Sequence, residues 1–439
     1  MRKSVQDQLS LRSCALALLL CFAVAAPSFA QAVGSRGVNT LAREGRLAVF
    51  DDVWQTINAR YYDPNFHGVD WQAQRAAFRP LAAEAQSAAE FYAVLRGMLR
   101  NLQDAHTRVY APDERFDWHR PRFISVGLSV REVAGQPVVV QVERGSEAER
   151  AGLRVGDTIN SIDGRSALNL FAHKLKEQAG SSTPAAARFR AMAMIFEGSR
   201  DSIVSVVWTD NKGKERQASL RREWRERDTS LHVRSVGSGY ALVQLNAFTP
   251  EAAQEFLRLM RGRLREARGL VLDLRSNGGG EAEVMTELAS LFLPPGRSLG
   301  QFIDRQGRVA FVPQTRTNFI FTAEPLIRFQ HPLVILTSER TSSAAEIFVA
   351  AMTEARRAYI VGGPTCGCVL AIRRRHTLPD GGELYVSEMD YRTATGTRLE
   401  GRGLTPDESV TLDCQDLRAH RDRTIDRAIE QLKSMSEER

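Results

Sequence analysis

A serine-rich turn between a strand and a helix is the part of the sequence best placed to carry chemistry. Leu333–Leu336 is a short apolar run that predicts a buried strand, and a helical pattern begins at Ser343. A hydroxyl at the start of a helix lies beside unpaired backbone N–H groups and the positive end of the helix dipole. These groups would stabilise negative charge on an acyl oxygen during attack by a serine. Taken alone, however, the motif favours a plain helix cap formed with Glu346.

A glycine-rich loop follows a second apolar strand. Asp273–Gly280 has the sequence DLRSNGGG, and its three glycines permit positive φ and a close approach of backbone N–H groups to a ligand. A phosphate cradle is one interpretation of such a loop. Neither GxGxxG nor GxxxxGK[ST] is present, which disfavours a nucleotide site.

The composition is that of a globular protein with two or three domains. The chain has 439 residues, of which 43% are apolar and 25% charged. The net charge of +7 is spread along the sequence without a basic patch interleaved with aromatic residues, so nucleic-acid binding is not expected. No set of His, Cys, Asp and Glu has the spacing of a zinc site. We therefore expect neither a metal nor a small-molecule cofactor.

Residues 1–30 have the pattern of a signal peptide. Basic residues precede the apolar stretch Cys14–Ala26, and a small-x-small pattern ends at Ala30, where we expect cleavage. The expected location is periplasmic or secreted. A retained N-terminal anchor, and hence membrane association, is the alternative, although the apolar stretch is short for a membrane span.

Three cysteines follow the predicted cleavage site: Cys366, Cys368 and Cys414. In an oxidising compartment two of them could form a disulfide. Our hypothesis is that Cys414 pairs with Cys366 or Cys368. The alternative is three free or buried thiols.

Residues 31–118 predict an N-terminal helical module. Apolar residues recur at the spacing of one buried helical face, and a second segment, residues 88–102, repeats the pattern. The module ends in the segment Asn101–Thr107, which contains His106. The residues of the first apolar face are Leu47, Phe50, Val53, Trp54 and Ile57.

Residues 119–224 resemble a PDZ domain. The strand Val138–Val142, a short helix and the strand Thr158–Ile162 match its pattern over some twenty consecutive positions. The resemblance implies that the segment Gly127, Leu128, Ser129 and Val130 forms the loop that holds a peptide carboxylate. Residues 180–198 look like a Met-rich insertion near the binding groove, which would cover the groove or line it.

Residues 225–439 alternate buried strands with helices, which indicates an α/β core ending in a C-terminal helix. Arg373–Tyr391, with Asp380-Gly381 at its centre, predicts a hairpin.

The ordered set of motifs resembles the C-terminal processing (tail-specific) serine protease family. The resemblance covers nearly the whole chain after residue 30 and implies a ClpP/crotonase-like α/β protease core, an N-terminal helical module and an inserted PDZ domain. The motifs of the core are Asp273–Gly280, Thr341–Glu346, Gly363–Cys368 and Leu399–Asp407.

By this resemblance Ser343 is the nucleophile, with Ser342 as the neighbouring alternative. The backbone N–H groups of Gly279 and Ala344 would form the oxyanion hole. The Ser-Lys members carry their lysine where this chain has Cys368, and beyond Lys214 only Lys433 remains. A Ser-Lys dyad is therefore not expected.

His106 is the best remaining base, because similar L-x-D-x-H-T segments occur in the tricorn-like branch of the family. Glu400 is the candidate to orient its imidazole, with Asp104 behind it. The alternatives are a structural histidine at position 106 and a salt-bridge or turn carboxylate at position 400.

We thus expect an exported serine-type endopeptidase that its PDZ domain guides to substrates with free C-termini or disordered segments. An oligomer is compatible with the sequence. The competing hypothesis is a catalytically inactive, protease-like protein that binds peptides or other ligands. The missing lysine is the feature that raises this second hypothesis.

Overall fold

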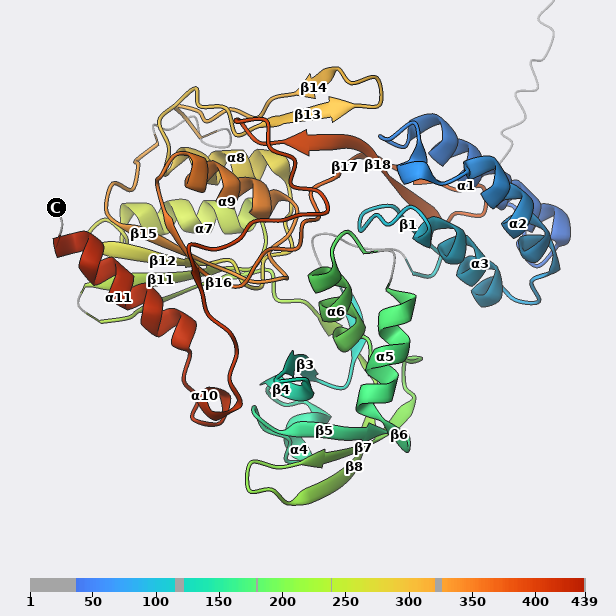
Figure 1. Cartoon of the computed structure of the whole chain (residues 1–439), viewed down its shortest axis with the longest axis horizontal. Coiled ribbons are helices and arrows are strands. Elements are labelled where there is room, and N and C mark those ends of the chain that lie inside the picture. Colours follow the sequence, from blue (N-terminus) through green and yellow to red (C-terminus); the bar gives the residue numbers. More distant parts are fainter. Residues whose placement is uncertain (1–36, 115–121, 179–180, 238, 320–325, 438–439) are drawn as a thin grey trace, which may run out of the picture. The chain divides into compact units, whose positions relative to one another are not determined.

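The computed structural model describes residues 37–114, 122–178, 181–237, 239–319 and 326–437 (Figure 1). The predicted signal peptide, residues 1–30, lies outside the described residues. Within the described ranges, no helix has both the length and the apolar character needed to span a bilayer.

Three helices form the N-terminal region, as the sequence predicted: α1 (Arg43–Arg60), α2 (Trp71–Glu84) and α3 (Ala88–Arg100). Asp70 and Ser87 cap α2 and α3, because each side chain accepts a backbone N–H bond from the first turn. The buried face of these helices also packs on apolar residues of strand β18 (Glu383–Arg392). Strand β1 (Arg108–Tyr110) continues from α3 and pairs with β18. The segment that carries His106 is thereby fixed between α3 and the core.

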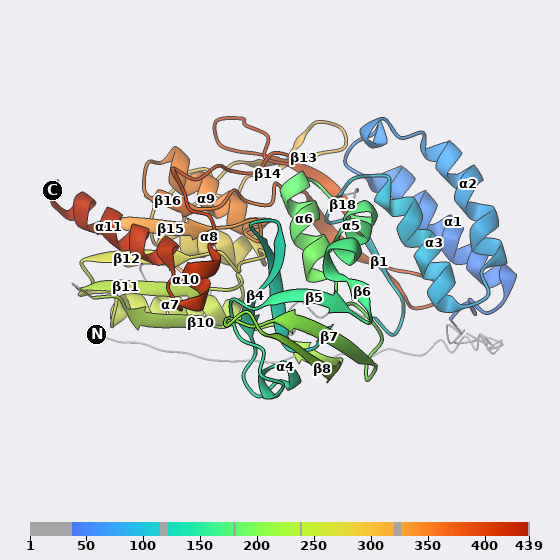
Figure 2. The same ribbon diagram turned by 60° about the horizontal axis from the view of Figure 1, so that its bottom comes forward.

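The next region has the sheet of a PDZ domain, in the order β3-β4-β5-β7-β8. Figure 2 labels β4, β5, β7 and β8 of this sheet. Strand β2 precedes this sheet and pairs with strand β9, which follows it. The predicted insertion forms helix α6, which packs on strand β3 and helix α5. The elements are β2 (Arg122–Ser125), β3 (Leu128–Val133), β4 (Gln136–Val142), α4 (Glu147–Arg150), β5 (Thr158–Ile162), β6 (Arg165–Ser166), α5 (Ala167–Glu177), α6 (Pro184–Ala193), β7 (Ile203–Thr209), β8 (Glu215–Arg221) and β9 (Glu223–Glu226).

The core contains a six-stranded sheet in the order β10-β11-β12-β15-β16-β19, in which β10 is antiparallel and the other strands are parallel. Helices α7, α8 and α9 cover one face, and α11 covers the other (Figure 1). The elements are β10 (Leu231–Ser235), β11 (Tyr240–Leu245), α7 (Pro250–Arg261), β12 (Gly269–Asp273), α8 (Ala282–Ser290), β15 (Leu333–Thr337), α9 (Ala344–Glu354), β16 (Tyr359–Gly362), β19 (Glu408–Ser409), α10 (Cys414–Arg418) and α11 (Arg423–Glu437).

The central strands are apolar on both faces because helices cover both. In β12, Leu272 packs toward α7, α8 and α9, whereas its neighbour Val271 packs toward α11. Ile335 and Val334 of β15 divide in the same way. This explains why these strands read as continuous apolar runs rather than as alternating ones. The mixed α/β fold with an N-terminal helical region and a PDZ domain is confirmed.

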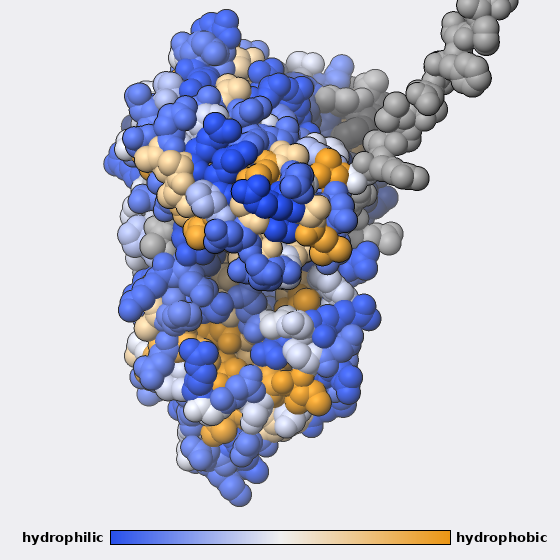
Figure 3. Space-filling view, turned by 90° about the vertical axis from the view of Figure 1, so that its right-hand side faces the viewer, coloured by the Kyte–Doolittle hydropathy of each residue, from blue (hydrophilic) through white to orange (hydrophobic). Residues whose placement is uncertain are grey.

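A second sheet joins β1, β13 (Gln301–Asp304), β14 (Val309–Phe311), β17 (Ala371–Thr377) and β18. Strands β17 and β18 form the predicted hairpin, whose turn contains Asp380 and Gly381. Figure 3 views the protein from the side of α1–α3 in Figure 1; hydrophilic side chains there separate several apolar patches.

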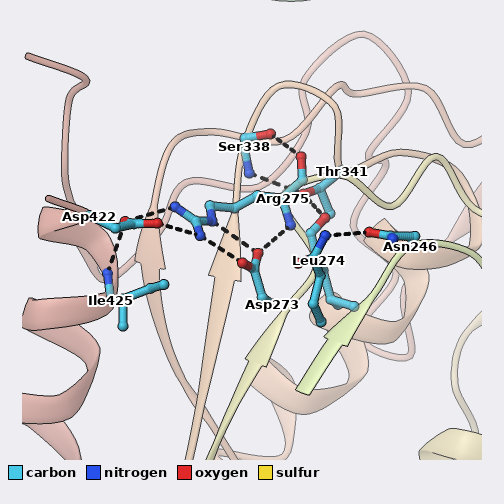
Figure 4. A network of polar contacts seen from close by, with 9 residues as sticks. Asn246, Asp273, Leu274, Arg275, Ser338, Thr341, Asp422 and Ile425 are labelled. Carbon is cyan, nitrogen blue, oxygen red and sulfur yellow. Dashed lines mark hydrogen bonds and ion pairs between the residues drawn. The ribbon is translucent and has the colours of Figure 1, made fainter. Parts of the chain in front are cut away.

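A network around Arg275 joins the end of β12 to α11 (Figure 4). Its guanidinium donates to Asp273 at 2.9 and 2.6 Å and to Asp422 at 3.0 and 2.8 Å. The two carboxylates raise the pKa of Arg275 against the effect of burial. Since Asp273 begins the glycine loop, this network fixes the start of that loop against the C-terminal helix.

We predict that Arg275→Ala lowers the free energy of unfolding by about 3 kcal/mol, because it leaves the buried Asp273 carboxylate without its partner. Urea unfolding followed by circular dichroism measures the change. Arg308→Ala is the matched control: its side chain is 73% exposed and pairs with Asp304. The control should cost less than about 1 kcal/mol. Equal losses in the two variants would contradict the prediction.

Candidate active site

Ser343 lies at the sharp turn between strand β15 and helix α9. It is the N-cap residue of α9 and has φ 58° and ψ −126°, a conformation that costs a non-glycine residue about 1–3 kcal/mol. A strained serine between a strand and a helix is also the geometry of nucleophile elbows, which present the hydroxyl at the edge of a sheet. The surrounding contacts hold the residue in this conformation. Its backbone N–H donates to the Cys368 carbonyl at 2.8 Å and lies 3.2 Å from Glu346 Oε2.

The serine turn is fastened to the glycine loop by side chains on the turn. Thr341 Oγ1 donates to the Leu274 carbonyl at 2.8 Å, and Ser338 Oγ donates to the Arg275 carbonyl at 2.7 Å (Figure 4). The Ser342 N–H adds a bond of 3.1 Å to the Asn277 carbonyl. The two motifs that the sequence separates by some sixty residues therefore form one unit.

Gly279 is in direct contact with the candidate nucleophile. It has φ 102°, and a Cβ built on it would lie 2.8 Å from Ser343 Cβ and 3.2 Å from the Ala344 nitrogen. The Gly279 N–H donates to Asn277 Oδ1 at 2.8 Å. An oxyanion bound here would have to replace Asn277 as the acceptor of that N–H.

The disulfide hypothesis for Cys414 is wrong. The structure joins Cys366 to Cys368, and Cys414 is free at the start of α10. The physical reason is proximity: Cys366 and Cys368 flank one turn residue, and their Cα atoms are 5.2 Å apart, within the range of protein disulfides. The pair lies beside the serine, because Cys368 supplies the carbonyl that holds Ser343.

Glu346 is fully buried and holds this cysteine turn. Its carboxylate accepts hydrogen bonds from Thr365 Oγ1 at 2.5 Å, the Gly367 N–H at 2.7 Å and the Cys368 N–H at 2.9 Å. Burial raises its pKa to about 7, although these donors favour the ionised form. Sequence reasoning assigned Glu346 only a capping role. The available signal was a single carboxylate within the apolar run of residues 344–352, because a carboxylate buried there needs hydrogen-bond partners.

Glu400 lies against the segment that follows the disulfide. Its Oε2 accepts hydrogen bonds from the N–H groups of Val369 at 2.6 Å and Leu370 at 3.2 Å. Its Oε1 is buried without a hydrogen bond of standard geometry, but the Ser182 hydroxyl lies close enough to the carboxyl to lower its pKa. Burial, together with the nearby charge of Asp104, raises the pKa of Glu400 to about 7.

His106 is held by a loop whose polar groups Asp104 organises. The Asp104 carboxylate accepts the His106 backbone N–H at 2.7 Å and the Thr107 hydroxyl, so it fixes the backbone rather than the imidazole. His106 Nδ1 is buried without a hydrogen-bond partner among the described residues. Burial lowers the pKa of His106 to about 4 against the opposing effect of Asp104. The imidazole is therefore neutral at pH 7, the state that a general base requires.

A small apolar cluster brings the histidine loop to the cysteine turn. Ala105 packs with Cys366, Cys368 and Ala186 of helix α6. The structure thus places Ser343, Gly279 and Ala344 in direct contact, and places His106 and Glu400 on segments that border the Cys366–Cys368 turn. In the described ranges, no group of three His, Cys, Asp or Glu side chains could hold a metal ion.

Gly127, the first residue of the predicted peptide-binding loop, fixes the start of that segment against the end of strand β4. Gly127 has φ 84°, and its carbonyl accepts the Glu143 N–H at 2.8 Å. Leu128 and Val130 are buried, and Ser129 is half-buried.

Strand β3 contains Leu128, Ser129 and Val130 of this predicted loop, and its next residue reaches the serine turn. Arg131 Nη1 lies 2.9 Å from Glu339 Oε1, and the Arg131 guanidinium also lies over the ring of Phe189 in α6. Phe189 in turn contacts Arg340. No pattern in the sequence pointed to this connection between the two regions.

Comparison with known proteins agrees with this architecture. Residues 239–410 match the sequence model of peptidase family S41. Residues 43–100 match the Tricorn protease C1 domain, and residues 138–173 match a PDZ domain. The larger part of the core is therefore similar to peptidase family S41.

Two relatives align with most of the chain. The chloroplastic carboxyl-terminal-processing peptidase 1 of Arabidopsis thaliana is 26% identical over 372 residues, covering 82% of this chain and 71% of the relative. The carboxyl-terminal-processing protease of Synechocystis sp. is 28% identical over 374 residues, covering 81% of this chain and 79% of the relative. The solved structure of mature CPAF with lactacystin shares the fold, with a TM-score of 0.65 and 14% identity, covering 90% of this chain and 98% of that one.

We predict that Gly279→Ala slows the reaction of Ser343 with a fluorophosphonate probe by about tenfold or more, because the new methyl group displaces the serine. Gly135→Ala is the matched control: Gly135 has φ 75°, but no atom lies within 4 Å of its added Cβ. Both variants should lose about 1–2 kcal/mol of stability from the positive φ. Labelling of Gly279→Ala at the rate of the control would contradict the prediction.

Proposed function

We propose that the protein is an exported serine endopeptidase that cleaves peptide bonds in disordered or C-terminal segments of proteins. Ser343 is the nucleophile and His106 the general base. The observation that carries this proposal is the position of Ser343 at a strained strand-to-helix turn, in contact with Gly279 and Ala344, within an S41 domain. Export rests on the N-terminal pattern of the sequence, with cleavage after Ala30.

The reaction follows from the groups at this turn. His106 takes the proton of the Ser343 hydroxyl as Oγ attacks the peptide carbonyl carbon. The carbonyl oxygen gains negative charge, which the N–H groups of Ala344 and Gly279 and the start of α9 stabilise. Collapse breaks the C–N bond, and the amine leaves with the proton from His106. Water, deprotonated by His106, then hydrolyses the acyl-enzyme and releases Ser343.

Two buried polar atoms support Glu400 as the group that orients His106. Buried polar atoms nearly always have a hydrogen-bond partner, yet His106 Nδ1 has none in the described part of the chain, and Glu400 Oε1 has only the nearby Ser182 hydroxyl, without standard geometry. One can donate a proton and the other can accept it. We infer that they pair, directly or through one water, when a substrate closes the site, which places Nε2 toward Ser343.

The missing lysine assigns the chain to the histidine-bearing, tricorn-like branch in this proposal. Cys368 is bonded to Cys366, so its sulfur cannot act as a base. The same absence is the observation that favours the alternative, a protease-like protein that binds peptides without cleaving them. The two functions differ in whether the Ser343 hydroxyl is activated.

We predict that a fluorophosphonate labels the wild-type protein at Ser343 and that Ser343→Ala abolishes both labelling and turnover of a disordered substrate such as casein. His106→Ala should lower kcat by about 10²–10⁴-fold, the usual contribution of a general base. Ser342→Ala is the matched control and should keep most of the activity. Mass spectrometry of the labelled peptide and the rate of casein cleavage provide the measurements.

Two outcomes would contradict this function. Full activity of Ser343→Ala would exclude Ser343 as the nucleophile. A wild-type protein that neither labels nor cleaves, yet binds peptides, would establish the inactive alternative.

We also propose that the PDZ region guides substrates by holding a free C-terminal carboxylate at Gly127–Val130. Its strand β3 contacts the serine turn through the Arg131–Glu339 ion pair, and helix α6 lies against both β3 and Arg340. A peptide that adds to β3 would therefore displace α6 and reach the turn that holds Ser343.

We predict that a peptide with a free C-terminal carboxylate has a kcat/KM at least about tenfold higher than the same peptide with a C-terminal amide, because the amide removes the charge that the backbone N–H groups bind. The amidated peptide is its own matched control, since the scissile bond is unchanged. Equal kcat/KM values for the two peptides would show that the PDZ region does not guide substrates by their C-termini.

A further inference from the structure

We propose that the Cys366–Cys368 disulfide is a redox site that positions Ser343 and that its reduction switches the enzyme to a low-activity state. This inference rests on the proposed function, because it concerns the same serine. Ser-Lys relatives carry their base at position 368. In this chain, the redox state of Cys368 would instead control the position of Ser343.

The disulfide turn is bound to the serine turn on both sides of the bridge. The Cys366 N–H donates to the Thr341 carbonyl at 2.9 Å, and the Cys368 carbonyl accepts the Ser343 N–H at 2.8 Å. These two hydrogen bonds hold Thr341 and Ser343, on either side of Ser342. A shift of either cysteine backbone would therefore move the backbone of the serine turn.

The same turn also holds the groups proposed to assist Ser343. Glu346 binds the N–H groups of Gly367 and Cys368, whereas Glu400 binds those of Val369 and Leu370. The Gly401 N–H, next to Glu400, donates to the Gly367 carbonyl at 2.9 Å. Residues 366–370 are therefore the common support of the nucleophile and of the carboxylate proposed to orient His106.

The backbone around Gly367 is closely packed, so it has little space in which to move. Gly367 has φ 70°, and a Cβ built on it would lie 2.6 Å from Thr183 Cγ2 and 2.8 Å from the Gly403 nitrogen. The covalent bridge closes a small ring around this glycine and fixes the separation of its neighbours. In the dithiol form the two non-bonded sulfurs separate and the ring opens, and we expect the released turn to let the Cys368 carbonyl leave the position that holds Ser343.

The chemistry is a thiol–disulfide exchange with a dithiol reductant. The reductant supplies two electrons and two protons, the S–S bond breaks, Cys366 and Cys368 become thiols, and the reductant becomes a disulfide. No other atoms change. Both cysteines are buried, and the Thr183 hydroxyl at the start of α6 donates to the Cys366 carbonyl at 2.7 Å, so the exchange requires α6 to move aside.

The test uses the mature full-length protein treated with dithiothreitol until alkylation with N-ethylmaleimide, read by mass spectrometry, shows both Cys366 and Cys368 labelled. We expect kcat to fall by about tenfold or more while KM stays within about twofold, and to recover after reoxidation. Cys366→Ser/Cys368→Ser should be locked at the low kcat and insensitive to dithiothreitol. Cys414→Ser is the matched control and should respond to dithiothreitol as the wild type does.

An unchanged kcat in fully reduced protein would overturn the proposal. The proposal would also be overturned if the loss of kcat follows unfolding measured by circular dichroism, or if reoxidation does not restore kcat. Either result would mean that the disulfide only stabilises the fold.

Backbone hydrogen exchange separates this inference from the proposed function if the oxidised protein shows no peptidase activity. Reduction should then still speed exchange of the Ser343 and Cys368 N–H groups by at least about tenfold, since the carbonyl and carboxylate that protect them have moved. Equal exchange in the two redox states would refute the positioning role, whatever the activity.

Discussion

The buried carboxylate of Glu346 is the interaction on which the candidate site depends. It lies in the buried part of α9, residues 344–352, whose other side chains are apolar, so every lone pair must find a donor within the protein. Those donors are the N–H groups of Gly367, Cys368 and Ser343 and the Thr365 hydroxyl. By accepting these hydrogen bonds, the carboxylate connects helix α9 to the cysteine turn. It also holds Ser343 at a positive φ, which a serine in an isolated chain would avoid. The strain at Ser343 and the burial of Glu346 are therefore two parts of one arrangement.

Much of this framework could be predicted from the sequence because it depends on local patterns. Apolar runs located the central strands, and the order of motifs indicated that the serine turn and the glycine loop belong to one site. Contacts between distant segments were not predictable. Nothing in the residue types shows that Arg131 of the PDZ region meets Glu339, that residues 184–193 form a helix against the serine turn, or that Glu346 binds two N–H groups from the next loop. The predicted disulfide of Cys414 was wrong for a related reason. It required a long-range bridge, whereas the turn around Gly367 brings Cys366 and Cys368 together.

Burial also accounts for the unusual electrostatics of the site. It lowers the pKa of His106 to about 4 and raises those of Glu346 and Glu400 to about 7. The His106 imidazole is thus neutral at pH 7 and free to accept a proton, and the mechanism we propose requires substrate binding to raise its pKa toward the working pH. In the proposed mechanism His106 supplies the base, and Cys368, at the position where Ser-Lys relatives carry their lysine, supports Ser343 through its carbonyl.

The central claim is that His106, oriented by Glu400, activates Ser343. A crystal structure of the protein with a phosphonate bound covalently to Ser343 tests it most directly. The account predicts His106 Nε2 within about 2.6–3.2 Å of the Ser343 Oγ or of a phosphonate oxygen, with Nδ1 paired to Glu400 Oε1 directly or through one water. A His106 ring that remains beyond hydrogen-bond reach of the phosphonylated serine, with no water between them, would contradict the account.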